Sequence, residues 1–133
     1  MAYPLTDIRG IGPDAAAILK SEGIRTTISL LRSAKTPHQR VKIAEITGAD
    51  EKRVLGWVTS ADRMRIKGVG WEYSELLRAV GVRTVKELKY RNPQKLVRAM
   101  RDAKDKQVRL FPSVGTVERW IESARKLPNL IRY

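Results

Sequence analysis

The chain has 133 residues, 42% of them hydrophobic, and its 27 Lys and Arg side chains against 14 Asp and Glu give a formal net charge of +13. This excess of positive charge favours a polyanionic partner, so nucleic acid is the leading partner class. With no cysteine and one histidine, the composition excludes a disulfide framework and a thiolate zinc site.

The first predicted elements are a tight turn at residues 10–12 and a helix that begins at Pro13. Proline suits the first turn of a helix because the N–H that it lacks would have no partner there. Gly23 fits a left-handed cap at the end of this helix. Thr26 and Thr36 are N-cap signals, so two further helices are expected to begin after them.

A long helix closes the first half of the chain. Its apolar residues recur at i, i+3, i+4, i+7 and i+10, which places them on one face. They are Val54, Trp57, Val58, Ala61 and Met64. This spacing predicts that the tryptophan and its neighbours pack in a core.

The second half of the chain repeats the first. At an offset of 58, eight residues between positions 8 and 30 recur unchanged: Ile8, Gly10, Gly12, Leu19, Gly23, Arg25, Thr26 and Leu30. The face of the long helix recurs at an offset of 63 as Val117, Trp120, Ile121, Ala124 and Leu127. We therefore expect an all-α fold of two tandem units, residues 1–63 and 64–133, each with four to five short helices. An insertion in the second unit should fall within residues 100–115.

Each unit contains one Gly-apolar-Gly step between an apolar segment and a helix. Glycine permits positive φ, and the N–H groups of such a turn and of the following helix's first turn form a concave anion site. We assign phosphate binding to these turns and to the nearby cations: Arg9, Gly10, Ile11, Gly12, Arg25, Arg65, Lys67, Gly68, Val69, Gly70 and Arg83. One such turn is equally consistent with a helix connection that binds nothing. Two copies in a basic chain favour a phosphate ligand.

Positive charge is concentrated in the second unit. Residues 1–63 carry 10 basic and 7 acidic side chains, whereas residues 64–133 carry 17 and 7. In the run "KLVRAMRDAKDKQVR", cations recur every third residue at Lys95, Arg98, Arg101 and Lys104. Such spacing keeps them on one drifting helical stripe, which could track a phosphate backbone. The alternative is a solvated helix face.

The stretches "IRGIGPDAAAILKSEGI" and "IKGVGWEYSELLRAVGV" resemble the helix-hairpin-helix motif of DNA repair and replication proteins. Over residues 5–127 the chain is similar to an uncharacterised bacterial family of unknown function with tandem units of this kind. The resemblance implies that hairpin amides hold DNA phosphates without reading base sequence. It also permits a monovalent cation at a hairpin and implies no other cofactor. The second copy departs from the first in having Trp71 where the first has Pro13.

These features favour a binding module over an enzyme. No clustered carboxylates or histidines suggest metal-assisted hydrolysis, and no nucleophile stands beside a base. We expect sequence-independent binding of nucleic acid, with duplex DNA as the leading ligand, in a cytoplasmic and nucleoid-associated or repair-accessory role. No apolar run reaches the roughly 18 residues of a membrane span, so no membrane is expected. For a binding module of this kind we also expect no small-molecule substrate. The alternative is a helical adaptor that docks an acidic protein. The choice between DNA and RNA and the oligomeric state stay open.

Overall fold

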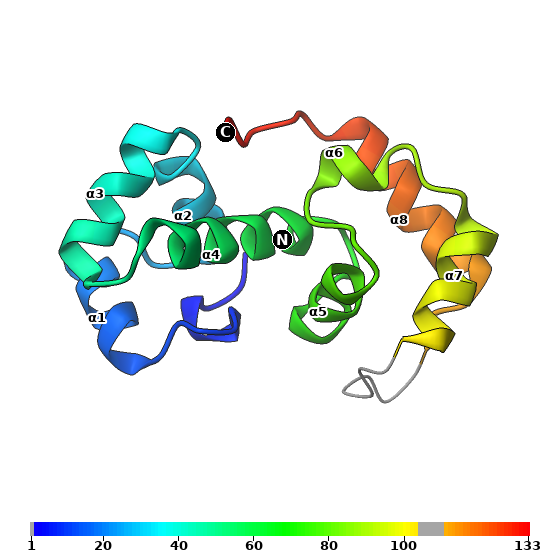
Figure 1. The fold of residues 1–133 in the computed structure, drawn as a ribbon, viewed down its shortest axis with the longest axis horizontal. Coiled ribbons are helices and arrows are strands. Elements are labelled where there is room, and N and C mark those ends of the chain that lie inside the picture. Colours follow the sequence, from blue (N-terminus) through cyan, green and yellow to red (C-terminus); the bar gives the residue numbers. More distant parts are fainter. Residues whose placement is uncertain (1, 104–110) are drawn as a thin grey trace.

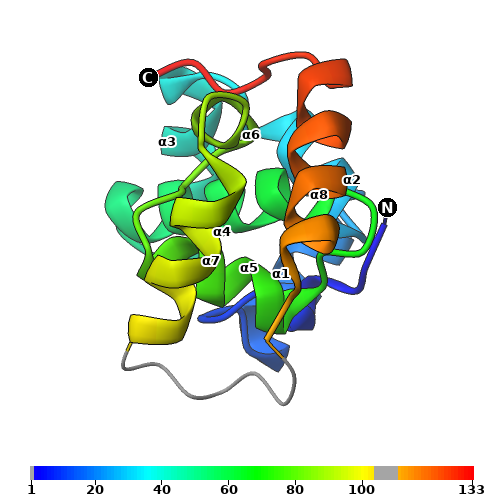
Figure 2. The ribbon, with the colours of Figure 1, turned by 90° about the vertical axis from the view of Figure 1, so that its right-hand side faces the viewer.

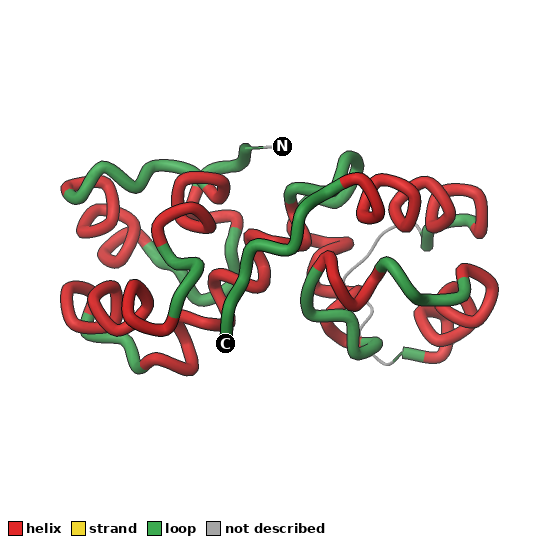
Figure 3. Tube along the Cα trace, turned by 90° about the horizontal axis from the view of Figure 1, so that it is seen from above, coloured by secondary structure: helices red, strands yellow, loops and turns green. Residues whose placement is uncertain are grey.

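The computed structural model describes residues 2–103 and 111–133, which form eight α-helices, one short 3-10 helix and no β-strand (Figure 1; Figure 3). The prediction of an all-α fold is confirmed. In chain order the elements are η1 (Leu5–Asp7), α1 (Pro13–Ser21), α2 (Thr27–Ser33), α3 (Pro37–Thr47), α4 (Glu51–Met64), α5 (Trp71–Ala79), α6 (Val85–Leu88), α7 (Pro93–Asp102) and α8 (Val114–Lys126).

The helix boundaries follow the capping signals of the sequence. Thr26, Thr36 and Thr84 each begin a helix with a capping box, in which the threonine side chain accepts a bond from the backbone N–H three residues later. Gly23 and Gly81 follow the ends of α1 and α5 with φ of 81° and 87°. These predicted starts and stops are confirmed. They matter because helices this short are marginal in water without caps and packing.

Each half of the chain has its own apolar core, built around the longer helix that closes it. In the first, α4 packs against α2 and α3, and every apolar residue predicted on its inner face is buried. In the second, α8 packs against α6 and α7, and Leu127 is the one residue of the predicted face that is only partly buried. The first core ends at Met64 and the second begins at Ile66. Figure 1 shows the two groups of helices on either side of the C-terminal end of α4.

The two halves differ most in the connection before their last helix. Only residues 48–50 separate α3 from α4, whereas α7 ends at Asp102 and α8 begins at Val114. The extra residues therefore lie within the predicted interval. Residues 104–110 of this connection are outside the described part of the chain.

Both terminal segments are attached to the first half of the molecule. The N–H of Tyr3 donates to Thr27 Oγ1 at 3.1 Å, and the N–H of Thr27 donates to the Tyr3 carbonyl at 2.9 Å. At the other end, the N–H of Arg132 donates to the Lys35 carbonyl at 2.8 Å, and Arg40 Nη2 donates to the Arg132 carbonyl at 2.6 Å. The segment after α8 thus returns across the molecule toward α2 and α3 (Figure 1; Figure 2).

Candidate nucleic-acid interface

The two Gly-apolar-Gly turns have the same backbone conformation. Gly10 and Gly68 have φ of 94° and 88°, in the left-handed region that glycine adopts without strain. The central residues Ile11 and Val69 are buried, and each donates its N–H to the carbonyl three residues earlier, at 3.1 and 3.0 Å. Because these two amides bond within the turns, they offer no donor to a ligand. Of the turn amides predicted to bind phosphate, those of the glycines remain.

The glycine amides on either side of the central residue remain open. Within residues 2–103 and 111–133, no acceptor binds the N–H of Gly10, Gly12, Gly68 or Gly70. These amides lie directly before α1 and α5, whose first-turn N–H groups also lack intrahelical partners. Each turn therefore leaves several backbone donors unbonded near one helix start, which is an arrangement suited to an anion.

One carboxylate stands at the start of each of these helices. Asp14 is exposed in the first turn of α1, and Glu72 is partly exposed in the first turn of α5. A carboxylate there stabilises the helix through its dipole but repels an incoming phosphate. Binding of a phosphate at either turn therefore requires nearby cations that offset this repulsion.

Three of the predicted cations lie at the surface, but Arg25 and Arg83 follow the ends of α1 and α5 that are opposite the turns. Lys67 and Arg25 are exposed, and neither forms an ion pair with another described residue. Arg83 is also exposed, and its Nε lies 4.0 Å from Glu87 Oε1. All three guanidinium or ammonium groups can reach a ligand without first breaking a buried contact.

Arg65 has a different role from the other predicted cations. Its side chain is 8% exposed, pairs with Asp62 at 2.7 Å and donates to the Pro128 carbonyl at 2.6 Å. The second oxygen of Asp62 accepts the N–H of Val85 at 2.8 Å, at the start of α6. Burial raises the pKa of Asp62 despite these partners. Arg65 thus joins α4 to the second half and the C-terminal segment, and we leave it out of the interface.

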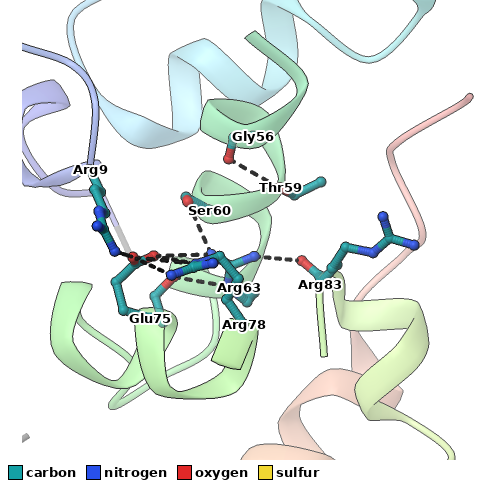
Figure 4. Close-up of polar contacts among 9 residues, drawn as sticks. Arg9, Gly56, Thr59, Ser60, Arg63, Glu75, Arg78 and Arg83 are labelled. Carbon is teal, nitrogen blue, oxygen red and sulfur yellow. Dashed lines mark hydrogen bonds and ion pairs between the residues drawn. The ribbon is translucent and has the colours of Figure 1, made fainter. Parts of the chain in front are cut away.

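Arg9 is exposed but is already paired across the two halves of the molecule (Figure 4). Its Nη1 lies 3.2 Å from Glu75 Oε1, on α5. Glu75 is 6% exposed and also pairs with Arg78 at 3.3 Å and with Arg63 at 3.6 Å. One buried carboxylate therefore neutralises part of the charge that the first turn was predicted to offer.

Arg63 is the centre of this junction and is 1% exposed. Nε donates to Ser74 Oγ, Nη2 to Ser60 Oγ and Nη1 to the Arg83 carbonyl, each at 3.0 Å. Burial lowers the pKa of Arg63 to about 10. Every polar face of the guanidinium is thus bonded, as a buried charge requires.

Sequence reasoning missed this junction, although the repeat contains a signal for it. Ser74 and Glu75 stand where the first copy has Ala16 and Ala17. Such a change, from small apolar to polar within otherwise matched helices, marks the face on which the second copy meets something that the first copy does not. Here that partner is Arg63, on the preceding helix.

The predicted stripe on α7 lies on the solvent side of that helix. Lys95, Arg98 and Arg101 are exposed, opposite the buried residues of the same helix. The fourth member, Lys104, lies outside the described residues.

Each turn also borders a cleft against the long helix of its own half. The first, of ≈ 340 Å³, is lined by Arg9, Gly10, Arg53, Trp57, Ser60 and Glu75 among others. The second, of ≈ 580 Å³, is lined by Lys67, Gly68, Arg119, Trp120, Ser123 and Lys126 among others. In both, the indole nitrogen faces the first glycine of the turn, since a Cβ added to Gly10 or Gly68 would lie 3.1 or 3.4 Å from it.

A family model described as "Domain of unknown function (DUF4332)" matches residues 9–127. No curated protein and no solved structure matches the chain. Among the described residues, no three His, Cys, Asp or Glu side chains gather as metal ligands. None of the described helices combines the length and apolar composition of a bilayer-spanning segment.

Proposed function

The chain belongs to the DUF4332 family, and for this member we propose sequence-independent binding of nucleic acid, with duplex DNA as the expected ligand. The observation that carries the proposal is the pair of matched turns, each with unbonded glycine amides at the start of a helix, in a chain of net charge +13. Contacts from such amides reach phosphates and not base edges, so the binding should not depend on base sequence.

We propose that the two turns are helix-hairpin-helix hairpins, in tandem units of residues 1–63 and 64–133. The supporting features are the shared backbone angles, the buried central residue and the helix that follows each turn. A role as a nucleoid or repair accessory in the cytoplasm belongs to the same proposal.

The second unit should supply most of the affinity. Its hairpin cation, Lys67, has no ion pair among the described residues, whereas Arg9 of the first hairpin is paired with Glu75. The exposed cations of α7 belong to the second unit as well. Electrostatic attraction to a duplex is therefore expected to orient this unit toward the phosphates.

Electrophoretic mobility shift with a random-sequence duplex tests the proposal. If four to six phosphates are neutralised, log K should fall against log salt with a slope of roughly −4 to −5. Lys67→Glu should weaken binding roughly tenfold and reduce the slope by about one. Lys42→Glu is the matched control, since it makes the same charge change at an exposed position of α3, outside both turns.

Two results would contradict the proposal. The first is no retardation at low salt, which would favour the adaptor that docks an acidic protein. The second is an equal loss of binding in both variants, which would indicate diffuse attraction to net charge. A parallel series with duplex RNA decides between the two nucleic acids.

A further inference from the structure

From the second cleft, between the Gly68 turn and α8, we infer a built phosphate site in which the indole N–H of Trp120 is a donor. This inference deepens the proposed function and rests on it for the source of the phosphate. It adds residues of α8 to the phosphate site that was predicted from the hairpin alone.

The indole of Trp120 is the first argument. The residue is 2% exposed, yet its N–H bonds to no described residue. The nitrogen is also not sealed in the core, because no buried side-chain nitrogen or oxygen of the described residues lacks a partner. Its N–H must therefore open onto the cleft beside Gly68, which it lines. This N–H is therefore available to an acceptor from outside the chain.

The charged side chains around the indole N–H of Trp120 indicate which kind of acceptor it would bind. Lys67, Arg119 and Lys126 line the same cleft. Lys126 is offset by Glu122 at 3.7 Å, but both side chains of that pair are well exposed, so the pair is weak. The surplus is positive, and with the N–H groups of Gly68 and Trp120 it suits an oxyanion.

The first cleft provides an internal precedent, because the chain itself places an anion there. Gly10, Trp57 and Ser60 correspond to Gly68, Trp120 and Ser123 by the offsets of the repeat. The carboxylate of Glu75 lines that first cleft and pairs with Arg9, which corresponds to Lys67. The second cleft is also lined by a carboxylate, but this is Glu122 of α8, whose side chain is well exposed and pairs with Lys126.

The precedent also argues against α1 or α5 of a second copy of the chain as the occupant. A neighbouring copy could present α1 in the way that α5 meets the first cleft, but α1 has Ala17 in the place of Glu75. Glu75 itself is already held by three arginines. An oxyanion from outside the chain therefore fits the second cleft best, and a nucleic-acid phosphate is the one that the proposed function supplies.

Nuclear magnetic resonance of the ¹⁵N-labelled chain tests the site directly. The three indole N–H signals are assigned with tryptophan-to-phenylalanine variants and followed during titration with inorganic phosphate at constant ionic strength. The Trp120 signal should move and saturate, whereas the Trp57 signal should not, because the carboxylate of Glu75 lines its cleft and repels an added anion. Equal movement of both signals, or of neither, would overturn the inference.

Variants make the test quantitative. Trp120→Phe and Arg119→Gln should each weaken phosphate binding roughly tenfold, as expected for loss of one hydrogen bond to a charged group. Trp57→Phe is the matched control and should leave the affinity unchanged. If Trp120→Phe fails to fold, Arg119→Gln decides alone, since Arg119 is exposed. An unchanged phosphate affinity in a folded Arg119→Gln variant would contradict the site.

Duplexes with and without a 5′-phosphate separate the inference from the proposed function. Movement of the Trp120 signal by inorganic phosphate but by neither duplex would leave the site standing and remove nucleic acid as its source. Binding of a duplex with no movement of the Trp120 signal would keep the proposed function and remove the site. A response to the 5′-phosphorylated duplex alone would assign the site to strand ends, and a response to both duplexes would assign it to the backbone.

Discussion

Glu75 is the residue on which the contact between the two halves depends most. Its carboxylate is nearly buried and accepts Arg9, Arg63 and Arg78, which come from three different segments. Arg63 is more deeply buried still and cannot move its charge into water. Loss of the carboxylate would leave that charge with hydroxyl and carbonyl partners only.

Glu75→Gln should therefore lower the free energy of unfolding by about 2–3 kcal/mol, somewhat less than removal of one partner from a fully buried pair. Urea denaturation measures the change. Glu122→Gln is the control, because it removes an exposed pair with Lys126 and should change the stability by less than about 0.5 kcal/mol. Similar effects of the two variants would show that the junction contributes no more than the surface pair.

Asp62 should make the stability depend on pH. Burial raises its pKa above the ordinary value of an aspartate, so as pH rises the unfolded chain releases this proton before the folded chain does. Between the two pKa values the folded state binds more protons, and the contribution of Asp62 to stability therefore falls as pH increases. Below the unfolded pKa that contribution is fully present.

The difference in unfolding free energy between wild type and Asp62→Asn isolates this effect. Measured by urea denaturation at a series of pH values from acid to neutral, wild type should lose stability relative to the variant as pH rises. A difference that stays constant, or that grows in favour of wild type, would mean that Arg65 outweighs the burial of the carboxylate.

At the scale of elements, the two turns differ in how much space they leave for a side chain at the first glycine. Gly10 and Gly68 both require positive φ, but an added Cβ would approach the indole nitrogen to 3.1 Å at Gly10 and 3.4 Å at Gly68. Gly70 has φ of −88° and nothing within 4 Å. Backbone strain and the closeness of the contact therefore predict that a side chain is tolerated worst at Gly10, better at Gly68 and best at Gly70.

Gly10→Ala should be the most destabilising of the three alanine variants and Gly68→Ala should cost about 1–2 kcal/mol, the cost of the left-handed region for a residue with a Cβ. Gly70→Ala should change the stability by less than about 0.5 kcal/mol and serves as the control. Thermal or urea unfolding gives the order. A Gly70 variant as unstable as the Gly68 variant would contradict this account of the turns.

The helices themselves were predictable because their signals are local. Thr36 and Thr84 start helices by bonds within one turn, and the spacing of Trp57 and Trp120 defines a face without knowledge of the partner. The pairing of Arg9 with Glu75 was not predictable, since it depends on how two separately closed units meet. The same limit applies to Arg65, whose spacing suits the hairpin but whose charge is used by Asp62.

At the scale of the whole molecule, the C-terminal segment joins the two halves a second time. Lys89 Nζ donates to the Leu127 carbonyl at 2.7 Å and to Asn129 Oδ1 at 2.8 Å, in the second half. Beyond this point, Arg132 bonds to the first half through Lys35 and Arg40. The segment thus holds both halves at once.

A chain shortened to end at Leu127 should lose about 2 kcal/mol of stability, from the hydrogen bonds removed at both halves. Hydrogen exchange should also lose protection in α2 and α3 more than in α7. Tyr133→Ala is the control, because this exposed side chain can be removed without loss of the backbone bonds of Arg132. Unchanged exchange in α3 would show that the segment lies on the first half without stabilising it.

The chain leaves the first half through α4 and comes back to it through the segment that ends at Arg132. The second half is therefore connected to the first at two points, α4 and the segment that ends at Arg132. Rotation of one half relative to the other would disturb both connections, α4 and the C-terminal segment. A long rigid ligand that contacted both halves would consequently meet two surfaces held at a fixed separation.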